Sequence, residues 1–147
     1  MLETLNRIQM NNLLSSQRIG RIACTDCGRP YVVPVTYSYD GKYIYGQSTE
    51  GMNINLLRKN PDVCFEVDQL QNLGNWQSVN VLGKFEELDN SEAQKARDLL
   101  HRHLFPLLTD YTVHGYGHAV ETPAKEHKLP VIYRIRIRKM TGTAEKH

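Results

Sequence analysis

The chain has 147 residues, 40% of them hydrophobic, which is enough apolar material for the core of one domain. Its 18 basic residues nearly balance its 16 acidic ones, and a formal charge of +2 argues against the basic field on which nonspecific nucleic-acid binding depends. No segment approaches the roughly 20 apolar residues of a membrane span, and the first residues lack the order of a signal peptide. We therefore expect a single cytoplasmic domain over residues 1–147.

The beginning of the chain predicts a helix followed by a β-hairpin. Apolar residues recur at helical spacing in residues 2–14, which predicts a short amphipathic helix. β-Branched and aromatic residues dominate residues 18–24 and 31–39, and turn residues separate the two segments. Pro34 interrupts the second strand. Because proline cannot donate to a ladder, we expect an edge strand or a bulge there.

A second hairpin and a change of period follow. Asp40-Gly41 is a strong hairpin signal, and residues 42–45 continue the sheet as a third strand. Beyond this strand the apolar period changes from two to 3.6, which predicts a helix that starts near Met52 and stops at Asn60-Pro61. Residues 63–67 and 78–85 predict two further strands, separated by a polar loop.

The last part of the chain predicts a helix, a long loop and a final strand. Ser91 and Gln94 have the spacing of a capping box, and the helix after them should end near Phe105-Pro106. Residues 131–137 predict the last strand, which alternates between an apolar face and a face that carries Arg134, Arg136 and, just beyond it, Arg138. Six strands with three short helices favour a mainly β fold, an antiparallel barrel, over a doubly wound sheet.

The three cysteines predict neither a disulfide framework nor a zinc site. Cys24 and Cys27 have CxxC spacing, but no second CxxC or finger-like histidine pair supplies the remaining zinc ligands. A redox CxxC usually opens a helix, whereas this one lies in a predicted hairpin turn. We interpret it as a turn that carries two thiols.

The junction between the third strand and the second helix is the candidate ligand site. Where a chain leaves a strand and starts a helix, several backbone N–H groups lack intrahelical partners and attract anions. Ser48 and Thr49 add hydroxyl groups, and Gly51 allows close approach of a ligand to the backbone. The alternative is that one of the hydroxyl residues is simply the helix N-cap.

Several short motifs occur together in order along the chain. They are Gly20-Arg21-Ile22-Ala23, residues 29–35, Ile44-Tyr45, Glu50-Gly51, residues 57–67 and Trp76-Gln77-Ser78-Val79. This ordered series resembles the FMN-binding split-barrel proteins, and the resemblance covers roughly residues 15 to 105. The nearest branch is the pyridoxamine 5'-phosphate oxidase-like group that includes the nitroimidazole-resistance reductases.

The resemblance implies a six-stranded antiparallel split β-barrel of Greek-key type with flanking helices. It implies a homodimer with FMN in a groove at the subunit interface, contacted by both chains. It places three groups of residues around the flavin. These are Pro34, Val35, Thr36, Tyr45 and Gln47 beside the isoalloxazine ring; Ser48, Thr49, Met52 and Asn53 near the ribityl phosphate; and Trp76, Ser78 and Val79 closing the pocket.

Two positions depart from the family pattern. Met52-Asn53 stands where relatives commonly have a basic pair, and a phosphate gains much from charge-assisted hydrogen bonds. FMN affinity should therefore be lower unless Arg58, Lys59 or a residue of the second subunit reaches the phosphate. Gln47 stands where relatives often have histidine, so a role of that histidine in proton transfer or haem ligation would be lost.

The sequence offers no recognisable catalytic set of its own. His114 and His118 are four residues apart, but the glycines between them oppose the helix that would place them on one face. If FMN binds, the cofactor carries the difficult chemistry and the protein orients donor and acceptor. We expect a flavoprotein that reduces a small oxidised substrate with electrons from a nicotinamide or similar donor. The alternatives are a non-catalytic protein that binds flavin, haem or a phosphometabolite, a true pyridoxamine 5'-phosphate oxidase, and an interaction module.

Overall fold

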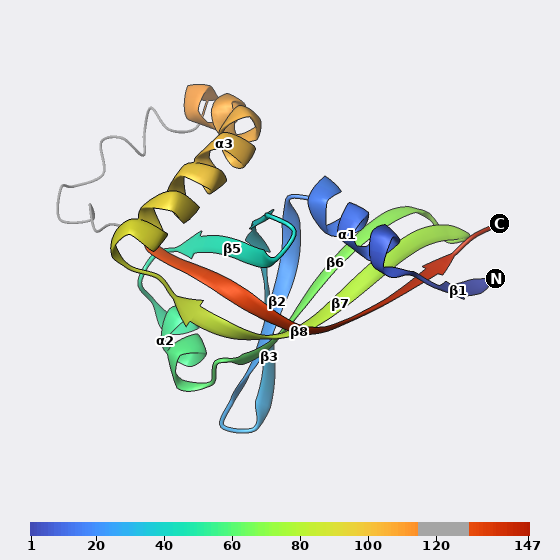
Figure 1. Ribbon diagram of the computed structural model, residues 1–147, viewed down its shortest axis with the longest axis horizontal. Coiled ribbons are helices and arrows are strands. Elements are labelled where there is room, and N and C mark those ends of the chain that lie inside the picture. Colours follow the sequence, from blue (N-terminus) through green and yellow to red (C-terminus); the bar gives the residue numbers. More distant parts are fainter. Residues whose placement is uncertain (115–129) are drawn as a thin grey trace.

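The computed structural model describes residues 1–114 and 130–147, and its elements form one curled antiparallel sheet with three helices around it (Figure 1). No helix in the described ranges is long and apolar enough to span a membrane. The elements are β1 (Leu2–Thr4), α1 (Arg7–Ser16), β2 (Ile19–Asp26), β3 (Arg29–Thr36), β4 (Ser38–Tyr39), β5 (Tyr43–Ser48), α2 (Met52–Lys59), β6 (Asp62–Asn72), β7 (Asn75–Glu87), α3 (Asn90–His114) and β8 (Val131–Glu145).

The strand order confirms the expected split β-barrel. The strands follow the order β3-β2-β6-β7-β8-β5-β4, and β1 pairs with the far end of β8. The sheet curls so that Cα atoms of β3 and β5 come within 8 Å of each other, although the two strands do not pair. The described ranges contain eight strands rather than six, because β1 and β4 are short pieces that the sequence pattern does not reveal.

Pro34 lies on an edge strand, as expected. β3 pairs with β2 only, and Pro34 is opposite Arg21 in that ladder. The other edge of β3 has no strand beside it among the described elements, so a proline costs no ladder hydrogen bond there. The turn before β3 uses Cys27 and Gly28, both at positive φ, which is the geometry of a two-residue hairpin. Cys24, Cys27 and Cys64 are all free thiols.

The sheet has an inner face that makes the core and an outer face that is polar at its centre. Val67, Val79, Val81 and Ile135 point inward and are completely buried. In β8 a bulge opposite Leu82 and Gly83 shifts the register by one residue, because Leu82 pairs with Lys139 and Gly83 with Ile137. The inward positions of β8 therefore change from odd to even numbers, and Ala144 is buried. This shift explains why the alternation in the sequence stops at Ile137 while the strand continues.

Helix boundaries at the start of the chain differ from the prediction. Residues 2–4 form a strand beside β8, and the helix begins after Asn6, whose side chain accepts a hydrogen bond of 2.8 Å from the Gln9 amide. The Gln9 side chain in turn accepts from the Asn6 amide at 2.8 Å. This capping box stops helical backbone from extending toward Leu2.

The prediction of a polar loop between the fourth and fifth predicted strands is wrong. β6 and β7 continue as a long hairpin, and only Leu73-Gly74 separates Asn72 from Asn75. Cross-strand amide pairs stabilise this polar extension: Gln77 donates to Gln69 at 2.8 Å. The hairpin, with β1 and the end of β8, projects beyond the barrel as a narrow wing (Figure 1).

The third helix is longer than expected and starts differently. α3 runs from Asn90 to His114 and passes the expected end at Phe105-Pro106. Ser91 is inside the helix, and Gln94 bonds to Arg97 and Asp98 instead of forming a capping box. The expected loop from Thr109 to Lys128 is therefore helical up to His114, and its remainder, with His118, lies outside the described residues.

α3 covers the outer face of the sheet at the β5 end. Ala93 and Ala96 pack on Ile132, and His103 shares a hydrogen bond with the buried hydroxyl of Ser38. These contacts cover one end of the outer face. Among the described elements, no helix covers the centre of that face, over β2, β3, β6 and β7.

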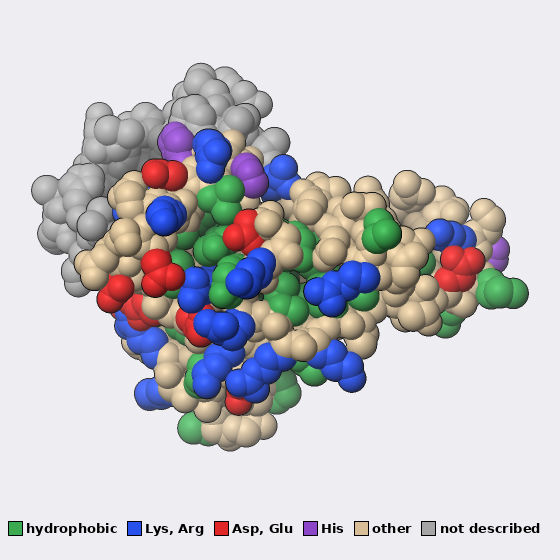
Figure 2. Space-filling view, viewed as in Figure 1, with side chains coloured by type: hydrophobic (Ala, Val, Ile, Leu, Met, Phe, Trp, Pro, Cys, Tyr) green, Lys and Arg blue, Asp and Glu red, His purple; other side chains and the backbone are tan. Residues whose placement is uncertain are grey.

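The arginines of β8 have acidic partners. Glu86 accepts hydrogen bonds from Nε of Arg134 at 2.8 Å and from Nε of Arg136 at 3.0 Å, and Asp62 lies 3.8 Å from Arg138. Figure 2 shows Lys and Arg side chains gathered over the middle of the face where Figure 1 places β8. The expected basic strand face is thus largely matched by carboxylates.

The ion pairs of Glu86 should make the stability of the fold sensitive to acid. Partial burial opposes ionisation of Glu86, but hydrogen bonds from Arg134 and Arg136 outweigh it and lower the pKa. A lowered folded-state pKa stabilises the fold above the usual glutamate range, and this stabilisation is lost as pH falls through the folded-state value. We expect Glu86→Gln to lower the free energy of unfolding by about 1 to 3 kcal/mol at pH 7. Urea unfolding of both proteins at pH 7 and in acid tests this, and a difference that persists undiminished in acid would contradict it.

Candidate functional site

The junction between β5 and α2 presents backbone N–H groups at the start of a helix. α2 begins after Gly51, whose φ of 169° and ψ of −169° are extended, and the first intrahelical bond runs from the Asn55 amide to the Gly51 carbonyl at 3.1 Å. Gly51 is the N-cap and makes no side-chain cap hydrogen bond. Ser48 instead donates to the Thr49 carbonyl at 3.1 Å. The alternative in which a hydroxyl residue caps this helix is therefore wrong, and a helix start of this kind suits an anion.

Space beside Gly51 is open. A Cβ built on Gly51 meets no atom within 4 Å. Gly51 and Thr49 are exposed, and Ser48 is half-buried. An anion can therefore approach this turn closely without displacing any described side chain.

Asn53 is held by the neighbouring hairpin. The Tyr31 hydroxyl of β3 donates to Oδ1 of Asn53 at 2.8 Å, which ties the start of α2 to the edge strand. The NH₂ group of Asn53 makes no hydrogen bond to another described residue, so it can serve as a neutral donor. Met52 is at the first helical position, and its side chain lies outside the described part of the chain.

Arg58 is not available as a substitute for the missing basic pair. Its guanidinium donates to both oxygens of Glu50 at 2.9 Å and to Glu87 at 2.7 and 3.0 Å. These hydrogen bonds raise the pKa of Arg58, with Glu87 the larger cause. The charge is already balanced by two carboxylates. Phosphate binding at this junction would rest on backbone amides and neutral side chains.

Six of the expected site residues lie on the outer face of the sheet. The register places Pro34 and Thr36 of β3 on the same face as Ser78 of β7, and β5 presents its own outward residues beside α3. These outward residues are Pro34, Thr36, Tyr45, Gln47, Trp76 and Ser78. A planar ligand on this face would therefore meet side chains of several strands.

Two of the expected contacts point the other way. Val79 is completely buried, and Val35 packs against the core from the inner side of β3. Strand alternation requires this, because each follows or precedes an outward residue. Their side chains support the sheet, and only their backbone can reach a ligand on the outer face.

Tyr45 lines a small cavity between the sheet and α3. The cavity has a volume of about 370 Å³ and is also lined by Asp40, Arg102 and Arg134. Tyr45 donates to Asp40 at 3.0 Å, and burial followed by this hydrogen bond raises the pKa of Tyr45 to about 12. The phenol is therefore neutral at physiological pH and acts as a hydrogen-bond donor.

Trp76 lies far from the junction within one chain. Gln47 pairs with Ile132 and Trp76 with Glu145, so the two positions are at opposite ends of β8. Thirteen residues at roughly 3.3 Å each separate them along the strand, which is about 40 Å. The expected site residues therefore do not form one pocket in a single chain.

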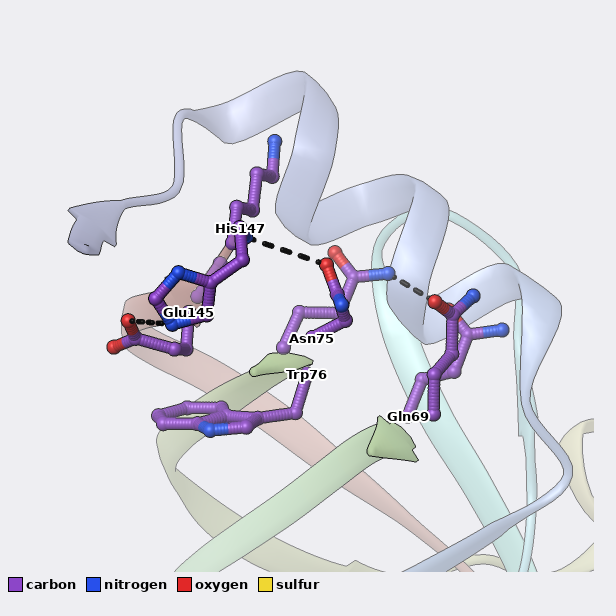
Figure 3. A pocket seen from close by; sticks show the side chains of 9 residues that line it. Gln69, Asn75, Trp76, Glu145 and His147 are labelled. Atoms are coloured by element: carbon purple, nitrogen blue, oxygen red, sulfur yellow. Dashed lines mark hydrogen bonds and ion pairs between the residues drawn. The ribbon is translucent and has the colours of Figure 1, made fainter. Parts of the chain in front are cut away.

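The surroundings of Trp76 form a separate open cavity of about 370 Å³ on the wing. Figure 3 shows the indole beside Asn75 and below Glu145 and His147 in that view, with Gln69 on the other side. His147 lies 3.5 Å from Glu145, and its backbone N–H donates to Asn75 at 3.5 Å. The indole is half-buried and remains open to a planar ligand.

The sequence prediction missed the charged group at the centre of the outer face. Pro34 is opposite Arg21, Arg21 is opposite Glu66, and Glu66 is opposite Asn80, so Arg21 and Glu66 lie between the β3 and β7 parts of the site. Nη1 of Arg21 donates to Glu66 at 3.2 Å and to Asp68 at 3.3 Å, and Ser78 donates to Glu66 at 2.9 Å. The sequence signal that could have revealed this group is the presence of charged residues at outward positions of otherwise apolar strands.

The fold and the site geometry agree with a match to a known family. A family model described as pyridoxamine 5'-phosphate oxidase matches residues 7–144. The chain belongs to this family. Because a shared fold does not fix function, membership by itself does not make this member a pyridoxamine 5'-phosphate oxidase.

Several proteins, two of them with solved structures, are similar to this chain. A FAD-binding protein from Mesorhizobium loti is 32% identical, with a TM-score of 0.77 and coverage of 100% of this chain and 98% of that chain. A putative 5-nitroimidazole antibiotic resistance protein from Bacteroides thetaiotaomicron is 21% identical, with a TM-score of 0.71 and coverage of 98% and 89%, and this likeness shows the fold alone. An uncharacterized Rhizobium meliloti protein is 31% identical over 84 residues, which span 57% of this chain and 56% of that relative.

Proposed function

We propose that this protein binds a flavin nucleotide on the outer face of its barrel and uses it to reduce a small oxidised substrate. The single observation that carries the proposal is the open space beside Gly51, the N-cap of α2, at a helix start that Tyr31 ties to the edge strand bearing Pro34. The similarity to the FAD-binding protein from Mesorhizobium loti supports it, since that match spans the whole chain.

The residues present fit such a cofactor. First-turn amides of α2 and the Asn53 amide suit the phosphate, and the outer face between Pro34 and Ser78 suits a planar ring. A bound flavin would supply the hydride and electron transfer chemistry. The chain's own part is to orient the ring against the edge strand, to keep the phosphate at the helix start and to hold protons near the ring.

The two candidate nucleotides, FMN and FAD, differ in the charge of their phosphate groups. FMN carries a phosphate monoester with a charge of about −1.5 to −2, which usually requires basic side chains. The two phosphates of FAD each carry a single charge, which suits the neutral donors found here better. The family resemblance makes FMN the first candidate. FAD is the second candidate, and it is supported by the absence of a basic pair and by the FAD-binding relative.

An added charge at Asn53 tests the position of the phosphate. We expect Asn53→Lys to tighten FMN binding by about tenfold, because a charge-assisted contact contributes roughly 1.5 kcal/mol. Titration of FMN fluorescence at two salt concentrations measures this. Tyr31→Phe is the matched control, since it removes the same hydrogen bond to Asn53 without adding charge and should not tighten binding. Unchanged or weaker affinity in Asn53→Lys would place the phosphate elsewhere.

We propose further that a second copy of the chain completes the site. Trp76 is too distant from the junction to contact the same ligand within one chain. The outer face also exposes apolar side chains beside its polar centre: Ile19 is 57% exposed, Val32 62% and Leu82 51%. Exposed apolar side chains next to polar groups are typical of a protein interface.

A charge at Leu82 tests the dimer. We expect Leu82→Glu to convert a dimer into monomers and to abolish flavin binding, because the carboxylate would be buried without a partner at the interface. Light scattering on a sizing column measures the mass, and circular dichroism confirms that the monomer is folded. Ile8→Glu, at a 71% exposed position of α1, is the control and should change neither property. A wild-type protein that is monomeric at micromolar concentration yet binds flavin would contradict the proposal.

A further inference from the structure

The Arg21, Glu66, Asp68 and Ser78 side chains form one hydrogen-bonded cluster on the outer face. Glu66 and Asp68 are two residues apart on β6 and therefore point the same way. Both accept from the single nitrogen Nη1 of Arg21, so one guanidinium serves two carboxylates. Ser78 occupies the second oxygen of Glu66. When both acids are ionised, the cluster carries one uncompensated negative charge.

Charged groups from the neighbouring elements do not cancel this charge. Among the described residues, β2 contributes Arg21, and β6 contributes Asp68 beside Glu66. β3 and β7 present only neutral groups next to the cluster, namely Pro34, Ser78 and Asn80. Partial burial raises the pKa of Glu66, Ser78 opposes the shift, Asp68 adds to it, and Arg21 opposes it again.

A ligand on this face would make the charge more costly. Glu66 and Asp68 are only 25% and 24% exposed, and a flavin spanning Pro34 and Ser78 would remove much of the remaining water. Two like charges that share a single cation respond to desolvation by retaining one proton between them.

We propose that Glu66 and Asp68 act as a proton-holding pair that takes up a proton when a flavin covers the outer face. The inference rests on the proposed function. It makes flavin affinity fall as pH rises, because the bound form carries more protons than the free form. It also places a proton beside the ring. A substrate that receives a hydride is left one proton short, and the pair lies on the face where that proton is needed.

Calorimetry of flavin binding tests the proposal. FAD and riboflavin are titrated into the flavin-free protein in two buffers with different ionisation enthalpies, and the difference gives the number of protons taken up. Neither probe carries a phosphate monoester, whose own pKa near 6 would confuse the result. The wild type should take up protons with both probes between pH 6 and 8, and its affinity should fall with rising pH.

Single substitutions show which carboxyl group takes up the proton. Glu66→Gln keeps the hydrogen-bonding shape and should abolish the proton uptake, with at least threefold tighter FAD binding at pH 8 and no gain at low pH. Asp68→Asn should reduce the uptake as well. Glu86→Gln is the matched control, because Glu86 is also a strand carboxylate bound to arginines but lies six residues beyond Asn80 on β7. It should leave the uptake unchanged.

Two failures are distinguishable. Flavin binding without proton uptake, or with uptake that persists in Glu66→Gln, overturns the proton-holding pair and leaves the proposed function intact. Absence of binding by both probes and by FMN overturns the proposed function. A carboxyl carbon NMR titration of the flavin-free protein then still examines the pair: independent single titrations of Glu66 and Asp68 at ordinary values would overturn it, and two coupled steps would support it.

Discussion

Replacing Gly83 by alanine is expected to destabilise the fold by about 3 kcal/mol or more. A Cβ at Gly83 would lie 2.6 Å from the Arg136 carbonyl oxygen and 2.7 Å from Cγ2 of Ile135. One neighbour is backbone and the other belongs to a completely buried side chain, so neither can move cheaply. The close approach follows from the bulge in β8, which brings the two strands together at this point. Urea unfolding monitored by circular dichroism measures the loss.

Gly51→Ala is the matched control for this prediction. Its new methyl group meets no atom within 4 Å, and its backbone is extended, which any residue adopts. Stability should be unchanged or slightly higher. Equal stability of wild type and Gly83→Ala would show that β7 and β8 are farther apart than the structure describes.

The same Gly51→Ala substitution is expected to weaken flavin binding at least tenfold, which corresponds to about 1.4 kcal/mol. The methyl group occupies the open space through which a phosphate would reach the first-turn amides of α2. Gly51→Val should weaken binding further without loss of stability, because the extended backbone accepts a β-branched residue. The measurement is flavin fluorescence titration alongside thermal unfolding.

A graded loss of affinity at constant stability would locate the ligand at Gly51 by steric exclusion alone. Wild-type affinity in both variants would remove the junction from the site, even if flavin binds elsewhere on the protein. The experiment thus separates the location of the ligand from the existence of binding.

Much of the barrel was predictable because its local signals agree with one another. The Cys27-Gly28 turn, the edge position of Pro34 and the Asp40-Gly41 turn were each correctly expected, since turn chemistry and proline restrict the backbone locally. The wing was not expected. Residues such as Gln69 and Gln77 look like loop residues in sequence, and their strand conformation depends on a cross-strand partner.

The helix ends and the β8 bulge could not be predicted from sequence, because both depend on pairing with a distant strand. The capping box at Asn6 and Gln9 competes with helix formation before it, and only the pairing of β1 with β8 decides in favour of a strand. The bulge opposite Gly83 reverses the inward positions of β8, so a fixed period of two could not predict the strand beyond Ile137.

The candidate site was predictable in its parts and not in its arrangement. The junction at Gly51 and the outward position of Ser78 follow from chain order and alternation. The separation of Trp76 from Gln47 depends on the length of β8, and the clamp of Arg58 between Glu50 and Glu87 depends on tertiary contacts. The pairing of Arg21 with Glu66 and Asp68 needed the strand register.

The absorption spectrum and mass of whatever copurifies with the protein are the decisive test of flavin binding and reduction. We predict a yellow protein that releases FMN or FAD on denaturation, and whose visible flavin band bleaches when a nicotinamide donor is added. A colourless protein that neither releases a flavin nor quenches added FMN, FAD or riboflavin at micromolar concentration would contradict it.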